Sequence, residues 1–131
     1  MRVANWPQVL DAKVEEWRAR ALVWGESDCC QLVGDFSVAL TGEDQRSRFP
    51  LYSSQEEAQA ILDLHGGMIG LLTAAFGEQK SAAQAKRGDV VAIGGDKGTL
   101  AAVCIGTRCV GPGPAGLVFR SMRDALCAWT V

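Results

Sequence analysis

The stretch WGESDCCQLVGD, residues 24–35, places an aspartate and two adjacent cysteines where a turn is expected to become a helix. Its Trp-Gly start favours a turn, and Ser27 or Asp28 is a good N-cap for a helix over residues 29–40. A cysteine in the first turn of such a helix meets unpaired backbone N–H groups and the positive end of the helix dipole, which both favour the thiolate. Cys29 is therefore a candidate nucleophile of a cysteine hydrolase.

A purely structural interpretation of the same stretch stays open. Five apolar residues of the expected helix lie near one face at helical spacing, namely Cys29, Leu32, Val33, Phe36 and Leu40. Because cysteine is often a small buried hydrophobe, Cys29 is also consistent with plain core packing. Cys30 points away from this face and has no independent claim to a function.

The composition is typical of a soluble globular protein, with 48% hydrophobic and 21% charged residues. A length of 131 residues is short for two domains, so we expect residues 1–131 to form one domain. Thirteen basic against fifteen acidic side chains give a formal net charge of −2. This balance offers no electrostatic reason to expect a nucleic-acid partner.

The N-terminal segment and the cysteines indicate a compartment. No apolar run approaches the ~18 residues that a membrane span needs, and the start MRVANWPQVLDAKVEEW lacks the apolar core of a signal peptide. Five cysteines, an odd number, fit a reducing compartment better than a disulfide framework. We therefore expect a chain that is cytoplasmic at synthesis, with no signal peptide and no membrane span.

Periodicity predicts helices in the first part of the chain and strands in the second. The helices are expected over residues 5–21, 29–40, 53–65 and 68–76, and the strands over 88–94, 100–106 and 116–122. Asn5 is a candidate cap for the first helix, and a Ser-x-x-Glu capping box, Ser53/Glu56 or Ser54/Glu57, starts the third. This order predicts an α+β fold in which N-terminal helices pack on a small C-terminal antiparallel β-sheet.

Three motifs in chain order resemble NlpC/P60-type cysteine peptidases, which are small papain-like domains. The first is the stretch at residues 24–33, in which Cys29 stands at the nucleophile position and Cys30 takes the place of a serine. The others are RGDVV at 87–91 and LAAVCIG at 100–106, which match two strands of that family. The resemblance covers roughly residues 22–111 and implies a papain-like fold.

The chain departs from this family at the base. Leu100 stands at the position that carries the family's catalytic histidine, and the polar third residue would fall within RCVGPG, residues 108–113, where no suitable group is present. A leucine cannot accept a proton, so hydrolysis is expected to be lost. Leu100 is also expected to desolvate the thiolate and to raise the pKa of Cys29. The only histidine, His65, is expected to interact with the C-terminus of its own helix.

The resemblance implies a setting as well as a fold. NlpC/P60-like domains recur in the tail-tip gene clusters of phages and gene transfer agents, and the end ALCAWTV, residues 125–131, suits that subset. The first hypothesis is a non-catalytic tail-tip or tail-assembly component that binds other tail-tip or hub proteins and enters a virion tail. Some of the four tryptophans could supply apolar surface for such contacts, although most are expected in the core.

Two alternatives stay open. One is an active cysteine peptidase or amidase that cleaves cell-wall peptidoglycan peptides through Cys29, assisted by His65 or by an acidic group such as Asp28 or Asp89. The other is a metal or iron–sulfur site that combines Cys104-x4-Cys109 with Cys29, Cys30 or Cys127, although this spacing fits no standard ligand pattern. The favoured interpretation includes neither a metal nor a cofactor.

Overall fold

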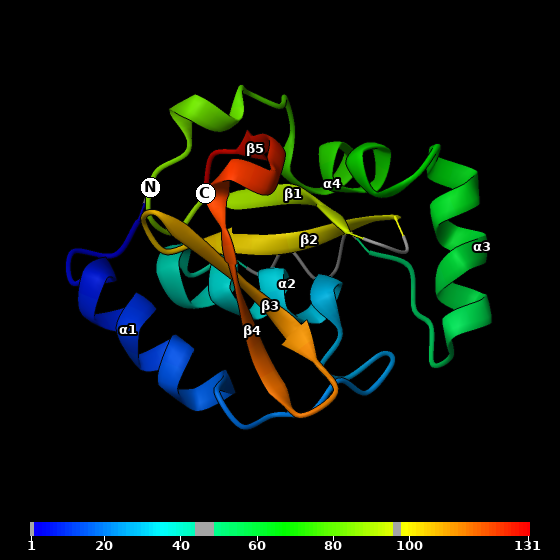
Figure 1. The fold of residues 1–131 in the computed structure, drawn as a ribbon, viewed down its shortest axis with the longest axis horizontal. Coiled ribbons are helices and arrows are strands. Elements are labelled where there is room, and N and C mark those ends of the chain that lie inside the picture. Colours follow the sequence, from blue (N-terminus) through cyan, green and yellow to red (C-terminus); the bar gives the residue numbers. More distant parts are fainter. Residues whose placement is uncertain (1, 44–48, 96–97) are drawn as a thin grey trace.

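The computed structural model describes residues 2–43, 49–95 and 98–131 and places four helices before a five-stranded sheet (Figure 1). The helices are α1 (Trp6–Trp17), α2 (Cys29–Thr41), α3 (Gln55–His65) and α4 (Met68–Phe76). The strands are β1 (Val90–Gly95), β2 (Gly98–Cys104), β3 (Arg108–Gly113), β4 (Gly116–Ser121) and β5 (Ala125–Trp129). The predicted α+β order, with helices first and an antiparallel sheet after them, is confirmed, although β3 and β5 were not among the three predicted strands.

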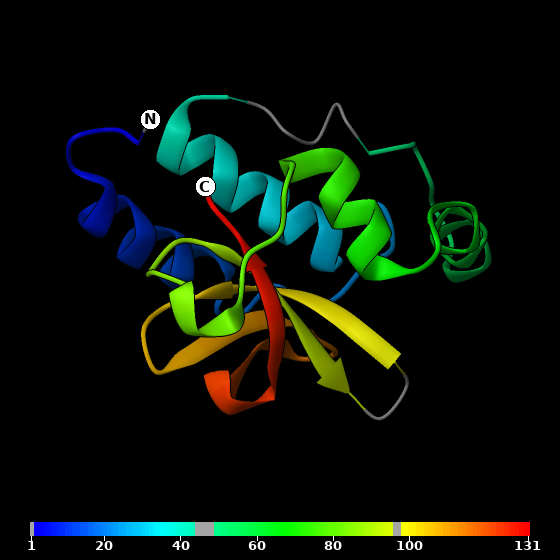
Figure 2. The ribbon, with the colours of Figure 1, turned by 90° about the horizontal axis from the view of Figure 1, so that it is seen from above.

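The strand order in the sheet is β4-β3-β2-β1-β5, and every neighbouring pair is antiparallel. Helices α2 and α4 lie against one face, as Figure 2 shows, and bury the main core there. The opposite face carries a smaller apolar cluster, against which Ala85, Met122 and Ala125 pack. Two short 3₁₀ helices lie in the connections: η2 (Ala82–Gln84) between α4 and β1, and η3 (Met122–Asp124) between β4 and β5.

The first helix is shorter than predicted, because it ends at Trp17 and not near Ala21. The residues that follow bond to the β3–β4 hairpin: the Arg18 carbonyl accepts from Leu117 N–H at 3.0 Å, and Leu22 N–H donates to the Gly113 carbonyl at 3.0 Å. These tertiary hydrogen bonds replace the helical ones that local propensity favoured. The expected Asn5 cap is also wrong, since this side chain makes no capping hydrogen bond.

The other helix starts follow their sequence signals. Ser54 caps α3 by accepting from Glu57 N–H at 3.1 Å, and the Glu57 carboxylate accepts in turn from Ser53 N–H at 3.2 Å. Of the two predicted capping boxes, Ser54/Glu57 is therefore the one that forms. Within the described residues no single helix is long and apolar enough to cross a membrane, and only α3 with α4, a pair bent by 76°, meets the length and composition criteria together.

Two of the four tryptophans lie in the core and two lie nearer the surface. Trp17 and Trp129 are buried, and each indole N–H has a partner: Trp17 donates to Asp35 at 2.7 Å and Trp129 to Thr73 at 3.3 Å. Trp6 and Trp24 are half-buried. Only Trp6 and Trp24 of the four tryptophans can therefore contribute aromatic surface to a contact.

Candidate functional site

Cys29 is the first residue of α2, and Asp28 caps that helix. The Asp28 carboxylate is buried and accepts three hydrogen bonds: from Gln31 N–H at 3.1 Å, Gly25 N–H at 2.6 Å and the Tyr52 hydroxyl at 2.6 Å. One carboxylate thus ties the helix start to the preceding loop and to a distant segment. Of the two candidate caps, Asp28 is the one used.

The Trp-Gly turn before the helix is held by a close backbone approach. Gly25 has φ of +82°, a conformation that side-chain-bearing residues rarely adopt. A Cβ at this position would clash with the Tyr52 carbonyl oxygen. Ser27 closes the same loop, because its hydroxyl donates to the Ala21 carbonyl at 2.6 Å and accepts from Val23 N–H at 2.9 Å. The glycine is therefore required both by its φ and by its neighbour.

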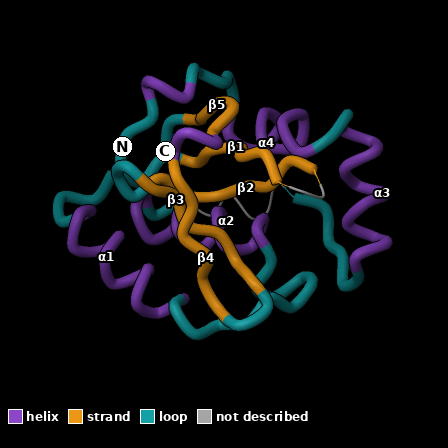
Figure 3. Tube along the Cα trace, viewed as in Figure 1, coloured by secondary structure: helices purple, strands orange, loops and turns teal. Residues whose placement is uncertain are grey.

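Strands β2 and β3 separate beside Cys29. Their ladder contains only two pairs, Val103 with Val110 and Cys104 with Cys109. The same register would next bring Ala102 opposite Gly111 and then Ala101 opposite Pro112. Proline has no N–H to donate, so the ladder cannot continue there. Figures 1 and 3 show β3 and β4 running across the direction of β2 beyond this point.

The alternation of backbone groups decides which way Ala101 faces. Cys104 N–H donates to the Asp89 carbonyl at 2.9 Å, on the β1 side of β2. Since β2 is regular against β1, every second residue has the same direction, and the N–H groups of Ala101 and Thr99 point to the opposite side, where β3 has moved away. On this side the Ala101 N–H acts on the Cys29 sulfur and lowers the pKa of its thiol.

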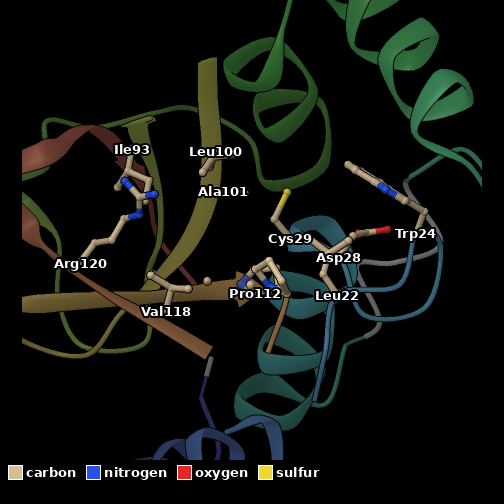
Figure 4. Close-up of a pocket in the computed structure, with 13 residues that line it drawn as sticks. Leu22, Trp24, Asp28, Cys29, Ile93, Leu100, Ala101, Pro112, Val118 and Arg120 are labelled. Carbon is tan, nitrogen blue, oxygen red and sulfur yellow. The ribbon is translucent and has the colours of Figure 1, made fainter. Parts of the chain in front are cut away.

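A groove surrounds Cys29 in the space that the two strands leave. Its inner part, about 200 Å³, continues into a wider part of about 490 Å³ that runs between β2, the Trp24 loop and α3. In Figure 4 the Cys29 sulfur points into this groove, with Leu100 and Ala101 on the β2 side and Val118 and Arg120 on the β4 side. The volume lies in the range of small-ligand sites.

The pKa of the Cys29 thiol is lowered from its ordinary value. This is the direction expected for a cysteine at a helix start and opposite to the effect expected of an apolar wall. The hydrogen bond with the Cys30 side chain is the largest cause; burial acts in the opposite direction, and the Ala101 N–H lowers the pKa further. The expected desolvation therefore exists but is outweighed. Leu100 lines the groove with Cys29 as expected, yet the sulfur also meets a backbone donor from the neighbouring residue.

Two residues of this site were missed or undervalued in the sequence. Cys30 is more deeply buried than Cys29, and its pKa is raised well above the ordinary value by the hydrogen bond with Cys29 and by burial. Tyr52 lines the groove, donates to Asp28, and has its pKa raised mainly by burial. The adjacent pair of cysteines is a sequence signal for Cys30. No local pattern connects Tyr52 to Asp28, which lies 24 residues away.

Of the groups proposed to assist Cys29, only Asp28 lines the groove. The Nδ1 atom of His65 lies 2.9 Å from the Ile61 carbonyl, so the ring bonds the last turn of α3 as predicted. Asp89 is buried elsewhere, with its carboxylate 2.9 Å from the Arg2 guanidinium and 2.7 Å from the Lys80 ammonium. Asp89 is therefore part of a structural ion-pair cluster.

The structure does not bring the cysteines together into the metal or iron–sulfur site that was one alternative from the sequence. Cys104 and Cys109 are cross-strand partners in the smaller cluster, whereas Cys29, Cys30 and Cys127 belong to the main core on the helix side of the sheet. Within residues 2–43, 49–95 and 98–131 no three cysteine, histidine or acidic side chains gather as metal ligands. All five cysteines are free thiols.

The arrangement favours binding over acid–base chemistry. It supplies an acidified thiol, but the only carboxylate that lines the described groove is committed to three hydrogen bonds, and no histidine lines it. Pro112 lies in β3, the strand in which the resembled family carries the polar residue that orients the base. Its side chain can neither donate nor accept a proton. A thiol without a base beside it can contact a ligand or be chemically modified. It lacks the proton acceptor that acyl transfer needs.

A comparison with curated proteins gives no match. The family model described as "Domain of unknown function (DUF6950)" matches residues 1–131. The chain therefore belongs, over its full length, to the DUF6950 family.

Proposed function

We propose that this protein is a non-catalytic component of a phage or gene-transfer-agent tail, built on a degenerate NlpC/P60-type, papain-like fold, and that its groove binds neighbouring tail-tip or hub proteins. The protein would be made in the cytoplasm and then incorporated into the particle. The fold and the setting come from the motif resemblance, and the non-catalytic character comes from the geometry around Cys29.

The absence of a free proton acceptor beside Cys29 carries this proposal. Among the residues described around the groove, Asp28 is the only carboxylate, and it is held by Gly25, Gln31 and Tyr52. Leu100 stands at the base position of the resembled family. Hydrolysis of an amide needs a proton for the leaving amine, and a missing acid–base partner typically costs 10²–10⁴-fold in rate.

The test of this proposal is an assay on peptidoglycan fragments. The purified protein and Cys29→Ala should both release no new peptide or amine from muropeptides, as read by mass spectrometry, with an active endopeptidase as the positive control. Tail particles purified from the source strain should contain the chain at a fixed ratio to the other tail proteins. Turnover that disappears in Cys29→Ala, or particles that lack the chain, would contradict the proposal.

The lowered pKa of Cys29 favours one second candidate, an active cysteine peptidase or amidase on cell-wall peptides. In this candidate Asp28 gives up one of its hydrogen bonds and accepts the proton of the Cys29 thiol. The thiolate attacks the substrate carbonyl, and Asp28 then passes the proton to the leaving amine as the C–N bond breaks. This candidate predicts turnover by the unmodified protein that Asp28→Asn reduces. The assay above separates the two functions in one experiment.

A further inference from the structure

The open side of β2 offers backbone groups that β3 does not use. Thr99 pairs with Gly94 of β1, and by the alternation described above its own N–H and carbonyl point into the space that β3 leaves. Ala101 has the same direction, and its N–H acts on the Cys29 sulfur. Thr99 lines the groove and is half-buried. An unpaired strand edge of this kind is a template for another extended chain.

The walls on both sides of this edge are apolar. Leu100 and Val118 remain 38% and 39% exposed, although large side chains of this type are usually covered. Across the groove, α3 contributes Ala58, Ile61 and Leu62. A segment that bonds to Thr99 would therefore place its apolar side chains against surfaces that are unfilled in the protein alone.

The wall of the groove carries a positively charged side chain. Arg120 of β4 lines both parts of the groove, and within the described residues it has no ion-pair partner. The neighbouring Arg108 differs, because its guanidinium stacks on the Phe119 ring at 4.9 Å and it lies outside the groove. Arg120 gives the groove a local positive charge that complements a carboxylate.

We propose that the groove receives an extended segment of a partner protein, which adds to the Thr99 edge of β2 as a short strand and pairs a carboxylate with Arg120. The proposal rests on the binding role proposed above, and it names the chemistry of the partner: L-residues in extended conformation, apolar side chains at alternate positions, and one acidic group. Backbone hydrogen bonds supply affinity and the alternate side chains supply selectivity in this mode.

Pro112 accounts for the open edge that strand addition would use. If residue 112 could donate an N–H, β3 would pair with β2 up to Ala101 and would narrow the space beside Thr99. Pro112 thus keeps the edge open, and the glycines on either side, Gly111 and Gly113, leave its wall without side chains. The groove therefore lies where the pairing between β2 and β3 is interrupted.

The test uses a synthetic array of octapeptides that alternate apolar and polar L-residues and carry one Asp or Glu, measured by fluorescence anisotropy on the full chain. The tightest peptide should lose at least tenfold in affinity with Arg120→Gln and less than twofold with Arg108→Gln, the matched control. N-methylation at one set of alternate peptide positions should abolish binding, and methylation of the other set should leave it intact. The Thr99 amide should shift in the ¹H–¹⁵N spectrum.

Other results would overturn this inference. They are an array without binders, equal affinity for Arg120→Gln, or binding that tolerates N-methylation at every position. Binding of peptidoglycan stem peptides in place of the array peptides would assign the groove to a cell-wall ligand. If no array peptide binds and muropeptides are not cleaved, this inference fails while the non-catalytic function stands; if muropeptides are cleaved, the proposed function itself fails.

Discussion

Ala101 of β2 and Pro112 of β3 would face one another two residues beyond Val103 and Val110, the last pair of the ladder between the two strands. Because Pro112 has no N–H, the ladder does not reach this position, and the Ala101 N–H lowers the pKa of the Cys29 thiol. Pro112 therefore keeps the groove open and leaves the Ala101 N–H beside the cysteine at the start of α2.

Replacing this proline is expected to weaken the acidification of Cys29. In Pro112→Ala the new N–H can pair with the Ala101 carbonyl, which draws the Ala101 N–H toward the residue 112 carbonyl and away from the sulfur. The pKa of Cys29 should rise, and the added hydrogen bond should stabilise the fold by about 1 kcal/mol. The rate of alkylation by iodoacetamide as a function of pH reports the pKa. Pro114→Ala, in the turn beyond β3, is the control and should leave the profile unchanged.

Cys29 should be the fastest thiol in the native protein. Its pKa is lowered, so between that value and the ordinary 9.0 more of it is thiolate than of any unperturbed cysteine. Burial raises the pKa of Cys127, which is 8% exposed and should react more slowly. Mass spectrometry of tryptic peptides after brief treatment at pH 7.5 measures the ratio. Equal rates would mean that Cys29 only packs in the core.

The Trp-Gly turn should not tolerate a side chain. Gly25→Ala forces a Cβ onto the Tyr52 carbonyl in addition to the cost of φ at +82°, and it should destabilise the protein by more than about 2 kcal/mol. Gly42 has nearly the same φ, +80°, but nothing lies within 4 Å of its Cβ position, so Gly42→Ala should cost only about 1 kcal/mol. Urea unfolding of both variants gives the difference, and similar values would contradict the close approach.

The Asp89 cluster should stabilise the fold without serving the groove. Asp89 also accepts from Lys86 N–H at 2.9 Å and Val131 N–H at 3.1 Å, so Asp89→Ala leaves several donors without an acceptor. A loss of about 3 kcal/mol is expected. Asp11→Ala removes an exposed 3.2 Å pair with Arg87 and should change stability by less than about 1 kcal/mol. Slower alkylation of Cys29 in folded Asp89→Ala would show that the two sites are coupled.

Much of the fold could be predicted because its signals are local. Asp28 and Ser54 cap helices as their sequence contexts indicate, and the ranges of α3 and α4 follow from apolar spacing and glycine stops. The end of α1 was wrong because hydrogen bonds from Leu22 and to Arg18 connect it to a hairpin almost 100 residues later. Such partners have no local signature.

The sequence by itself determined that helices precede strands, that a capped helix begins at Cys29, and that no histidine stands at the position of Leu100. Only the tertiary structure decided that Ala101 meets Cys29, that Tyr52 bonds Asp28, and that Arg120 enters the groove. The physical reason is that capping and periodicity act over a few residues, whereas the direction of a thiol's pKa depends on which distant N–H groups and apolar walls surround it.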